Sequence, residues 1–197
     1  MDAQRCLIVL DRDGVLNQLI DNPSEPRPDS PMRASQVAVF PWVPQALHDL
    51  TQAGFGIVVA SNQPGWAKGK TTRADLEAAH AAVLREAQSG GGVILSSHIC
   101  YHRAEDGCLC RKPAPGLLAE AFARHAGYAV ESSWMVGDRA VDVLAGTAFG
   151  LRTALLAADS AERATLESRG VDPDFLGADL RAFARFLLYR KNQILTR

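Results

Sequence analysis

The 197-residue sequence has few cysteines and no long apolar run, and neither sign of charge is in excess. Four cysteines in a chain of this length do not suggest the disulfide framework of a small secreted domain. The first apolar run, Cys6–Leu10, has five residues, which is too short for the core of a signal peptide or for a membrane span. We therefore expect a cytoplasmic protein without a membrane partner.

The charges nearly cancel, because 21 Lys and Arg residues stand against 22 Asp and Glu residues and leave a net charge of -1. This balance gives no electrostatic basis for binding a long nucleic acid, so no nucleic-acid partner is expected. Hydrophobic residues make up 47% of the chain, enough for a sizeable core, and the length suits one domain covering residues 1–197. We find no internal repeat and expect a monomer.

Apolar runs with strand character alternate with segments of helical periodicity. The expected strands are Cys6–Leu10, Phe55–Ala60, Gly92–Cys100, Trp134–Val136 and Leu151–Leu156. The expected helices cover Val43–Leu50, Leu76–Ala87 after a start at Thr72, the segment from Pro115 to a stop at Gly127, and Ala178–Tyr189. Near-continuous apolar strands separated by helices predict an α/β fold with a doubly wound parallel sheet that is covered on both faces.

One stretch, Asn22–Gln36, shows neither periodicity and contains four prolines. Loops of this length in compact domains are usually functional or mobile. A solvated surface loop without a role is the alternative interpretation.

Polar side chains stand where the expected strands end. Asp11 and Asp13 follow the first strand, Ser61 follows the second, and Asp138 follows the fourth. Because open parallel sheets bind ligands outside the carboxyl ends of their strands, these side chains should meet at one edge, and Lys112 before a helix start should join them. A lone Asp-x-Asp-Gly is often only a turn or a helix cap, but the whole set in chain order indicates a site.

Carboxylates gathered in this way repel one another unless a cation neutralises them. Oxygen ligands suit magnesium, which typically shares a substrate phosphate. If the metal and Lys112 screen the charge of that phosphate, Asp11 can attack phosphorus and form an aspartyl-phosphate. Asp13 lies two residues further on, where it can protonate the leaving alkoxide and later deprotonate the attacking water.

The chain resembles the haloacid dehalogenase superfamily of phosphatases over essentially its whole length. The matching motifs are Asp11-Arg12-Asp13-Gly14-Val15-Leu16-Asn17, Ser61-Asn62-Gln63, Arg111-Lys112-Pro113, and Gly137-Asp138-Arg139 with Asp142. This resemblance implies a magnesium-dependent phosphomonoesterase in which Asp11 is the nucleophile and Asp13 the general acid/base. The presence of Asp13 also favours a phosphatase over a dehalogenase, which needs no acid at that position.

The same resemblance assigns the remaining ligands. The implied magnesium ligands are Asp11, the backbone carbonyl of Asp13, and Asp138. The implied phosphate- and substrate-binding residues include Ser61, Asn62 and Lys112. Asp142 either supports the site from behind, carries a charge on the helix surface, or takes part directly. Neither usual insertion point for a cap domain holds one, so a capless, open site is expected.

Three of the four cysteines share a short loop with a histidine. The candidate zinc ligands are Cys100, His102, Cys108 and Cys110. Three thiols and one imidazole in a closed loop have the composition of a structural zinc site. Two alternatives stay open: the cysteines are reduced and bind no metal, or His98 replaces His102, since His98 shares a strand face with Cys100.

The cysteine loop narrows the resemblance to the heptose bisphosphate phosphatases and the histidinol-phosphate phosphatases. Its Cys-x-Cys pair runs straight into Arg111 and Lys112, so zinc would fix the loop that carries both cations. In the heptose enzymes, the arginine before the lysine contacts substrate and the residue after the fourth-motif aspartate helps bind phosphate, which makes Arg111 and Arg139 binding candidates. The chain departs from the usual Ser-Gly-x-x-Arg-Gly at Pro64–Gly69, where lysine is not equivalent to arginine.

The leading hypothesis is the removal of the C7 phosphate of D-glycero-D-manno-heptose 1,7-bisphosphate, a step that the resemblance places in lipopolysaccharide precursor synthesis. The alternative enzyme is a histidinol-phosphate phosphatase. An alternative of another class is a non-catalytic, zinc-stabilised interaction module, although intact Asp11 and Asp13 argue against it. The expected partner is a small phosphorylated substrate, a sugar bisphosphate.

Overall fold

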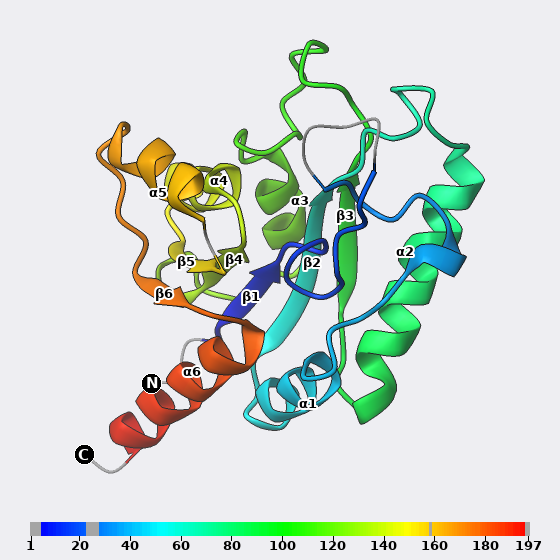
Figure 1. The fold of residues 1–197 in the computed structure, drawn as a ribbon. Coiled ribbons are helices and arrows are strands. Elements are labelled where there is room, and N and C mark those ends of the chain that lie inside the picture. Colours follow the sequence, from blue (N-terminus) through cyan, green and yellow to red (C-terminus); the bar gives the residue numbers. More distant parts are fainter. Residues whose placement is uncertain (1–4, 23–27, 158, 196–197) are drawn as a thin grey trace.

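Six parallel strands form one sheet in the order β3-β2-β1-β4-β5-β6 (Figure 1). The computed structural model describes residues 5–22, 28–157 and 159–195. The strands are β1 (Leu7–Leu10), β2 (Gly56–Asn62), β3 (Ser96–Cys100), β4 (Trp134–Gly137), β5 (Arg152–Leu156) and β6 (Phe175–Gly177). The order reverses at β1, which pairs with β2 on one side and with β4 on the other. Sheets of this kind bind ligands at such a reversal point, outside the carboxyl ends of the strands.

The central strand β1 shows why the sheet lies in the middle of the molecule. All four of its side chains are buried, and they alternate between two hydrophobic clusters. Ile8 and Leu10 pack on one face of the sheet, whereas Leu7 and Val9 pack on the other. A strand buried on both faces must be apolar at every position, which is the pattern that distinguishes it from a half-exposed strand.

Helices cover both faces (Figure 1). The helices are α1 (Val43–Gln52), α2 (Arg73–Ala87), α3 (Gly116–Arg124), α4 (Ala140–Phe149), α5 (Ser160–Glu167) and α6 (Leu180–Leu195). Buried residues of α1, α2 and α6 pack on the face of Ile8. Buried residues of α3 and α4 pack on the face of Leu7, and α5 extends this layer through Leu166 against α4.

The predicted α/β fold with a parallel sheet covered on both faces is confirmed. The start of α2 is as expected, because the Thr72 side chain accepts a hydrogen bond from the Asp75 backbone nitrogen. The expected strand Gly92–Cys100 was too long, since β3 begins only at Ser96. The pattern did not predict α4, α5 or β6, and α6 begins and ends later than expected.

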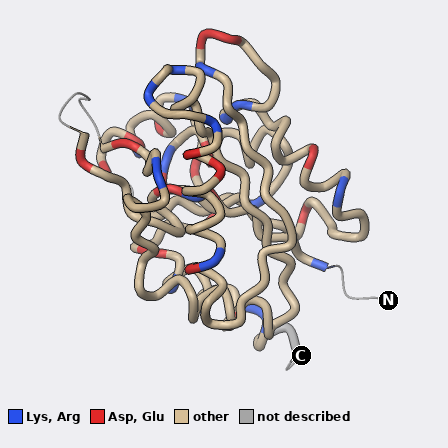
Figure 2. The backbone as a smooth tube through the Cα atoms, turned by 90° about the vertical axis from the view of Figure 1, so that its right-hand side faces the viewer, with Lys and Arg blue, Asp and Glu red and all other residues tan. Residues whose placement is uncertain are grey.

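The loops at the carboxyl ends of the strands hold no additional domain among the described residues. Between β1 and β2 lie loops, a short 3₁₀ turn and α1, and between β2 and β3 lies α2. Residues 23–27 of the proline-rich stretch fall outside the described part, but Ile20 and Asp29 on its two sides pair as an antiparallel bridge. Acidic and basic positions are interspersed along the backbone (Figure 2), in keeping with the balanced composition. None of the described helices is both long and apolar enough to cross a membrane.

Candidate active site and metal centre

A cavity of about 410 Å³ opens at the carboxyl edge of the sheet, beside the point where the strand order reverses. Most of the residues expected at the site line it: Asp11, Asp13, Ser61, Asn62, Lys112, Asp138 and Arg139. Asp142 also lines it. The outer wall comes from the loop after β1 and from the segments around α4 and α5: Leu19, Pro28, Asp29, Ser30, Val141, Ala157, Asp159 and Glu162. The volume is in the range of small-molecule sites.

Lys112 occupies the centre of this site and is almost completely buried. Its Nζ lies 2.9 Å from Oδ1 of Asp11 and 2.6 Å from Oδ1 of Asp142. It also donates to the carbonyl of Ala60, at 2.7 Å. An ammonium group has three protons to donate, so these three oxygens hold it in one position.

Burial and mutual repulsion raise the pKa values of two acid groups in this site. Burial raises the pKa of Asp11 to about 6, even though the Lys112 ammonium works in the opposite direction. Burial raises the pKa of Asp138 further, to about 8, with help from the negative charges of Asp11 and Asp142. Burial alone would lower the pKa of Lys112, but the carboxylates of Asp11 and Asp142 raise it above its ordinary value. One lysine therefore does not balance the three acids, and a further cation fits the site.

The donor atoms suit magnesium. Carboxylate oxygens of Asp11, Asp138 and Asp142 lie within 4.8 Å of one another. Oδ1 of Asp138 is buried and makes no hydrogen bond with the described residues. Gly14, at φ 80°, allows Asp138 its close approach, because a Cβ at Gly14 would come within 2.0 Å of Oδ2 of Asp138. Hard oxygen ligands with an unsatisfied carboxylate among them match the preference of magnesium.

Asp142 is a buried member of the site, which excludes the interpretation of a charge on the helix surface. One of its oxygens meets Lys112, and the other accepts a hydrogen bond from the Arg139 backbone nitrogen at 3.1 Å. These contacts let Asp142 cap α4 and hold Lys112 at the same time.

Asp13 lies beside Asp11 but in a different environment. Its carboxylate accepts hydrogen bonds from Arg12, Asn17 and Gln63, at distances between 2.6 and 3.0 Å. Arg12 and Asn17 are completely buried. The sequence motifs contain Arg12, Asn17 and Gln63, but their pattern predicted no role for them. The available signal was an arginine between two acids directly after an apolar strand, where a buried cation needs a partner.

Asn62 and Ser61 differ in whether their side chains are already used by contacts within the protein. The Asn62 amide donates to the Lys112 carbonyl at 3.0 Å and accepts from the Lys112 nitrogen at 3.1 Å, so both of its ends bind the backbone of the lysine. Ser61 lines the cavity and accepts a hydrogen bond from Gln63 at 2.9 Å.

The two arginines expected to bind substrate, Arg111 and Arg139, lie in different places in the structure. Arg139 lines the cavity, and its Nε lies 3.7 Å from Oε1 of Glu162. Arg111 does not line the cavity, and its Nη1 donates to the carbonyl of His102 at 3.2 Å. In this conformation Arg111 binds the backbone of the cysteine loop, and its contact with substrate stays a prediction.

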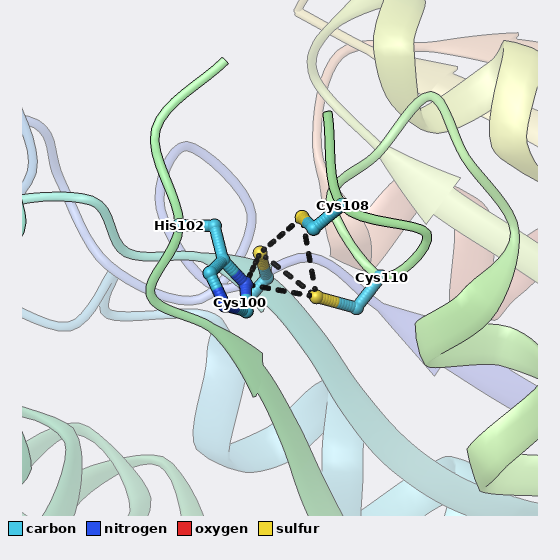
Figure 3. Close-up of side chains that lie close together, drawn as sticks. All are labelled: Cys100, His102, Cys108 and Cys110. Carbon is cyan, nitrogen blue, oxygen red and sulfur yellow. Dashed lines mark hydrogen bonds between the residues drawn. The ribbon is translucent and has the colours of Figure 1, made fainter. Parts of the chain in front are cut away.

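A second cluster lies at the end of β3 and in the loop that leads to α3 (Figure 3). The side chains of Cys100, His102, Cys108 and Cys110 come together, with one donor atom from each within 4.8 Å of the others. The sulfur–sulfur distances are 3.2 to 3.7 Å, and Nδ1 of His102 lies 3.2 Å from Sγ of Cys110. Burial and the neighbouring thiols raise the pKa of Cys110 to about 12, so a cation is needed to keep the three sulfurs ionised together. Four such ligands in this arrangement fit a closed zinc site.

His98 does not belong to this cluster. Its Nε2 lies 2.9 Å from the Ser96 hydroxyl, and its Nδ1 lies 3.2 Å from Glu120. The alternative in which His98 replaces His102 is therefore wrong. The imidazole of His98 binds side chains of β3 and α3 instead of the thiols.

Comparison with known proteins agrees with this geometry. A family model described as HAD-hydrolase-like matches residues 109–183. The D-glycero-beta-D-manno-heptose-1,7-bisphosphate 7-phosphatase of Pseudomonas putida is 36% identical over 187 residues, which cover 92% of this chain and 99% of that protein. The crystal structure of the D,D-heptose 1,7-bisphosphate phosphatase of B. bronchiseptica, complexed with magnesium and phosphate, matches with a TM-score of 0.79 at 33% identity and covers 94% of this chain and 99% of that one.

The chain belongs to the haloacid dehalogenase-like (HAD) hydrolases, and within them it is a phosphatase. The carboxylates of the cavity fit magnesium, which the B. bronchiseptica structure contains, and the cysteine–histidine cluster fits zinc. A weaker similarity is to the histidine biosynthesis bifunctional protein HisB of Legionella pneumophila, at 33% identity over 136 residues. That match covers 69% of this chain but 37% of HisB.

Proposed function

We propose that this phosphatase removes the C7 phosphate of D-glycero-D-manno-heptose 1,7-bisphosphate through an aspartyl-phosphate on Asp11. The observation that carries the chemistry is the buried pair of Asp11 and Lys112 on the cavity wall. Asp138 lies beside them, and its buried Oδ1 has no hydrogen-bond partner among the described residues. The substrate is supported by the relatives, since those that cover most of both chains are heptose 1,7-bisphosphate 7-phosphatases.

The first step forms a bond between an Asp11 oxygen and phosphorus. The bond from phosphorus to the C7 oxygen breaks, and Asp13 gives its proton to the departing alkoxide. A carboxylate can attack a phosphate dianion only where the negative charge is screened. Lys112 supplies one screening charge from a fixed position, because three oxygens hold its ammonium group.

The second step returns the enzyme to its starting state. A water molecule attacks phosphorus, Asp13 takes its proton, and the Asp11 carboxylate leaves as inorganic phosphate forms. Asp13 is then protonated again and ready for the next substrate, so one residue serves as acid and base in turn.

Phosphoryl binding falls to Ser61, Lys112 and Arg139, which all line the cavity. Asn62 contributes by holding the backbone of Lys112 in place. The residues proposed to hold magnesium are Asp11, the backbone carbonyl of Asp13, and Asp138. When bound there, magnesium neutralises the charge of the phosphoryl group and of these carboxylates.

Zinc has a structural role in this proposal, with Cys100, His102, Cys108 and Cys110 as its ligands. Cys110 precedes Arg111 directly, and Lys112 follows, so the metal fixes the loop that delivers the lysine to the cavity. Four protein ligands leave no open position at zinc for water or substrate.

Histidinol phosphate is the second candidate substrate, and one observation favours it. The outer wall of the cavity carries Asp29, Asp159 and Glu162, which would suit a cationic amine, while Arg111 points elsewhere. These carboxylates are already used, however. Asp29 pairs with Lys70 at 2.7 Å, and Asp159 and Glu162 accept backbone hydrogen bonds at the starts of α5 and α4. The heptose substrate therefore remains the stronger proposal.

We also propose that residues 1–197 act as one monomeric phosphatase domain in the cytoplasm. A single sheet supplies both clusters, and a reducing compartment keeps the thiols of the zinc site available. A non-catalytic interaction module would have no use for the buried Asp11–Lys112 pair.

The test compares kcat/KM for heptose 1,7-bisphosphate, histidinol phosphate and a hexose monophosphate, in the wild type and in Asp11→Asn. We expect the heptose bisphosphate to exceed histidinol phosphate by at least about tenfold, or roughly 1.4 kcal/mol of transition-state binding. Asp11→Asn should reduce turnover of every substrate by several orders of magnitude, because it removes the attacking charge. A surface variant, Asp49→Asn, is the matched control. Higher kcat/KM for either other ester would refute the substrate, and near-native turnover of Asp11→Asn would refute the mechanism.

A further inference from the structure

The carboxylate of Asp13 is held by four hydrogen bonds from three side chains. Nε and Nη2 of Arg12 donate to Oδ1 and Oδ2, both at 3.0 Å. Nδ2 of Asn17 donates to Oδ1 at 2.9 Å, and Nε2 of Gln63 donates to Oδ2 at 2.6 Å. Each carboxylate oxygen therefore has two donors, which fixes both the position and the rotation of the group.

The three donors are held in place by burial, and two of them, Arg12 and Gln63, also bind each other. Arg12 and Asn17 are 0% exposed and Gln63 is 2% exposed. Nη2 of Arg12 also donates to Oε1 of Gln63 at 2.8 Å. This bond fixes the orientation of the Gln63 amide, since the reverse orientation would set an amide NH₂ against the guanidinium.

Gln63 also connects Asp13 to the proposed phosphoryl-binding residue Ser61. Its Nε2 carries two protons, of which one reaches Asp13 and the other reaches Oγ of Ser61 at 2.9 Å. The same amide thus contacts both Asp13 and the hydroxyl that we propose to bind the phosphoryl group. In the arrangement seen, both oxygens of Asp13 accept hydrogen bonds, and the Gln63 amide divides its two protons between Asp13 and Ser61.

We propose that Arg12, Asn17 and Gln63 are positioning residues for proton transfer by Asp13, and that Gln63 couples this transfer to phosphoryl binding at Ser61. The inference rests on the proposed role of Asp13 as general acid/base. Its physical basis is that proton transfer requires a hydrogen-bonding distance and a fixed direction between the acid and the leaving oxygen. A carboxylate on the loop after β1 would rotate freely without these donors.

The experiment uses the leaving group as the reporter. An alkyl phosphate such as glycerol 3-phosphate needs a proton on its departing oxygen, whereas p-nitrophenyl phosphate releases a weakly basic phenolate that does not. Gln63→Met keeps the volume and removes the amide. We expect it to reduce kcat for the alkyl ester at least about tenfold more than kcat for the aryl ester, a part of the 10²- to 10⁴-fold that general acid catalysis typically supplies. Gln45→Met, at an exposed position of α1, should change neither.

Two further variants separate the possible failures. Asp13→Asn should show the largest difference between the losses of kcat for the two esters. If Asp13→Asn shows no such difference, the role of Asp13 as acid/base is refuted, and not this inference alone. Arg12→Lys keeps the buried charge but loses the two-pronged contact, so it should show the same difference as Gln63→Met and serves where that variant does not fold. If Asp13→Asn separates the two esters while both positioning variants slow them equally, the three residues are only structural and the inference is wrong.

Discussion

Asn62 and Lys112 are joined by two reciprocal hydrogen bonds between a side-chain amide and a backbone. Nδ2 of Asn62 donates to the Lys112 carbonyl at 3.0 Å, and Oδ1 accepts from the Lys112 nitrogen at 3.1 Å. Asn62 is the last residue of β2, so the sheet itself determines where the lysine enters the cavity. The side chain of Lys112 then needs only its own three contacts to hold the ammonium group beside Asp11.

Replacing this asparagine should therefore damage catalysis through the lysine. Asn62→Leu leaves the backbone groups of Lys112 without partners, at a cost of about 1 to 3 kcal/mol for each buried group. We expect a lower melting temperature, and kcat/KM reduced by at least about tenfold because Lys112 is displaced. Gln52→Leu, at the exposed last residue of α1, should leave both values unchanged. If Asn62→Leu retains native activity, the lysine does not depend on this contact.

Metal analysis distinguishes the two metals. Protein purified without chelator should contain about one tightly held zinc per chain, whereas turnover should require added magnesium. Cys110→Ser should release the zinc and reduce activity at saturating magnesium, because the loop carrying Lys112 loses its anchor. Cys6→Ala is the control, since Cys6 lies at the edge of β1 and takes no part in the cluster. Protein without zinc, or Cys110→Ser with full activity, would contradict a zinc anchor.

The stability of the protein should fall in mild acid because of His80. Burial, followed by the positive charge of Arg12, lowers the pKa of His80 from 6.5 to about 4. The unfolded chain therefore takes up the proton first, so the free energy of unfolding is unaffected above pH 6.5 and decreases progressively down to about pH 4. The free energy of unfolding should therefore be lower by roughly 3 kcal/mol once the pH has fallen below the pKa of His80 in the folded protein.

Urea unfolding at pH 7, 6, 5 and 4 measures this effect by comparing the wild type with His80→Gln. Carboxyl groups that titrate in the same range contribute to both proteins and cancel in the comparison. The variant should lose less stability on acidification, and the gap should open between pH 6.5 and pH 4. Parallel pH profiles of the two proteins would show that His80 is not the titrating group.

The residues at the strand ends were predictable because two simple rules coincide there. Leu7–Leu10 is apolar at every position, which predicts a strand buried on both faces, and polar residues directly after such a strand lie at the ligand-binding edge. Asp11 and Asp138 follow from these rules. The cysteine–histidine cluster was equally predictable, since short spacing along the chain nearly forces three thiols and an imidazole together.

The residues that support Asp13 were harder to predict from the sequence, because their roles depend on partners that are distant in the chain. Gln63 is 50 positions from Asp13 in the chain, and only the pairing of β1 with β2 brings them together. The helix α4 escaped detection for a different reason: it packs against both the sheet and neighbouring helices, so it is apolar on several sides and shows no stripe. The strand β6 has three residues, too few for any periodicity to appear.

The strand order also has a consequence for how the protein is made. β1 lies between β2 and β4, so residues 7–10 cannot pair on both sides until residues 134–137 have been synthesised. A ribosome that has synthesised the first hundred residues has released Asp11, Asp13 and Ser61, but not Lys112 or Asp138. Pairings this distant in the chain are slow to form, and they leave the apolar edge of β1 exposed in the meantime. The emerging chain thus has no complete catalytic centre until about two-thirds of it has been synthesised, and protection of the nascent β1 edge during that interval is a requirement that this topology imposes on the cell.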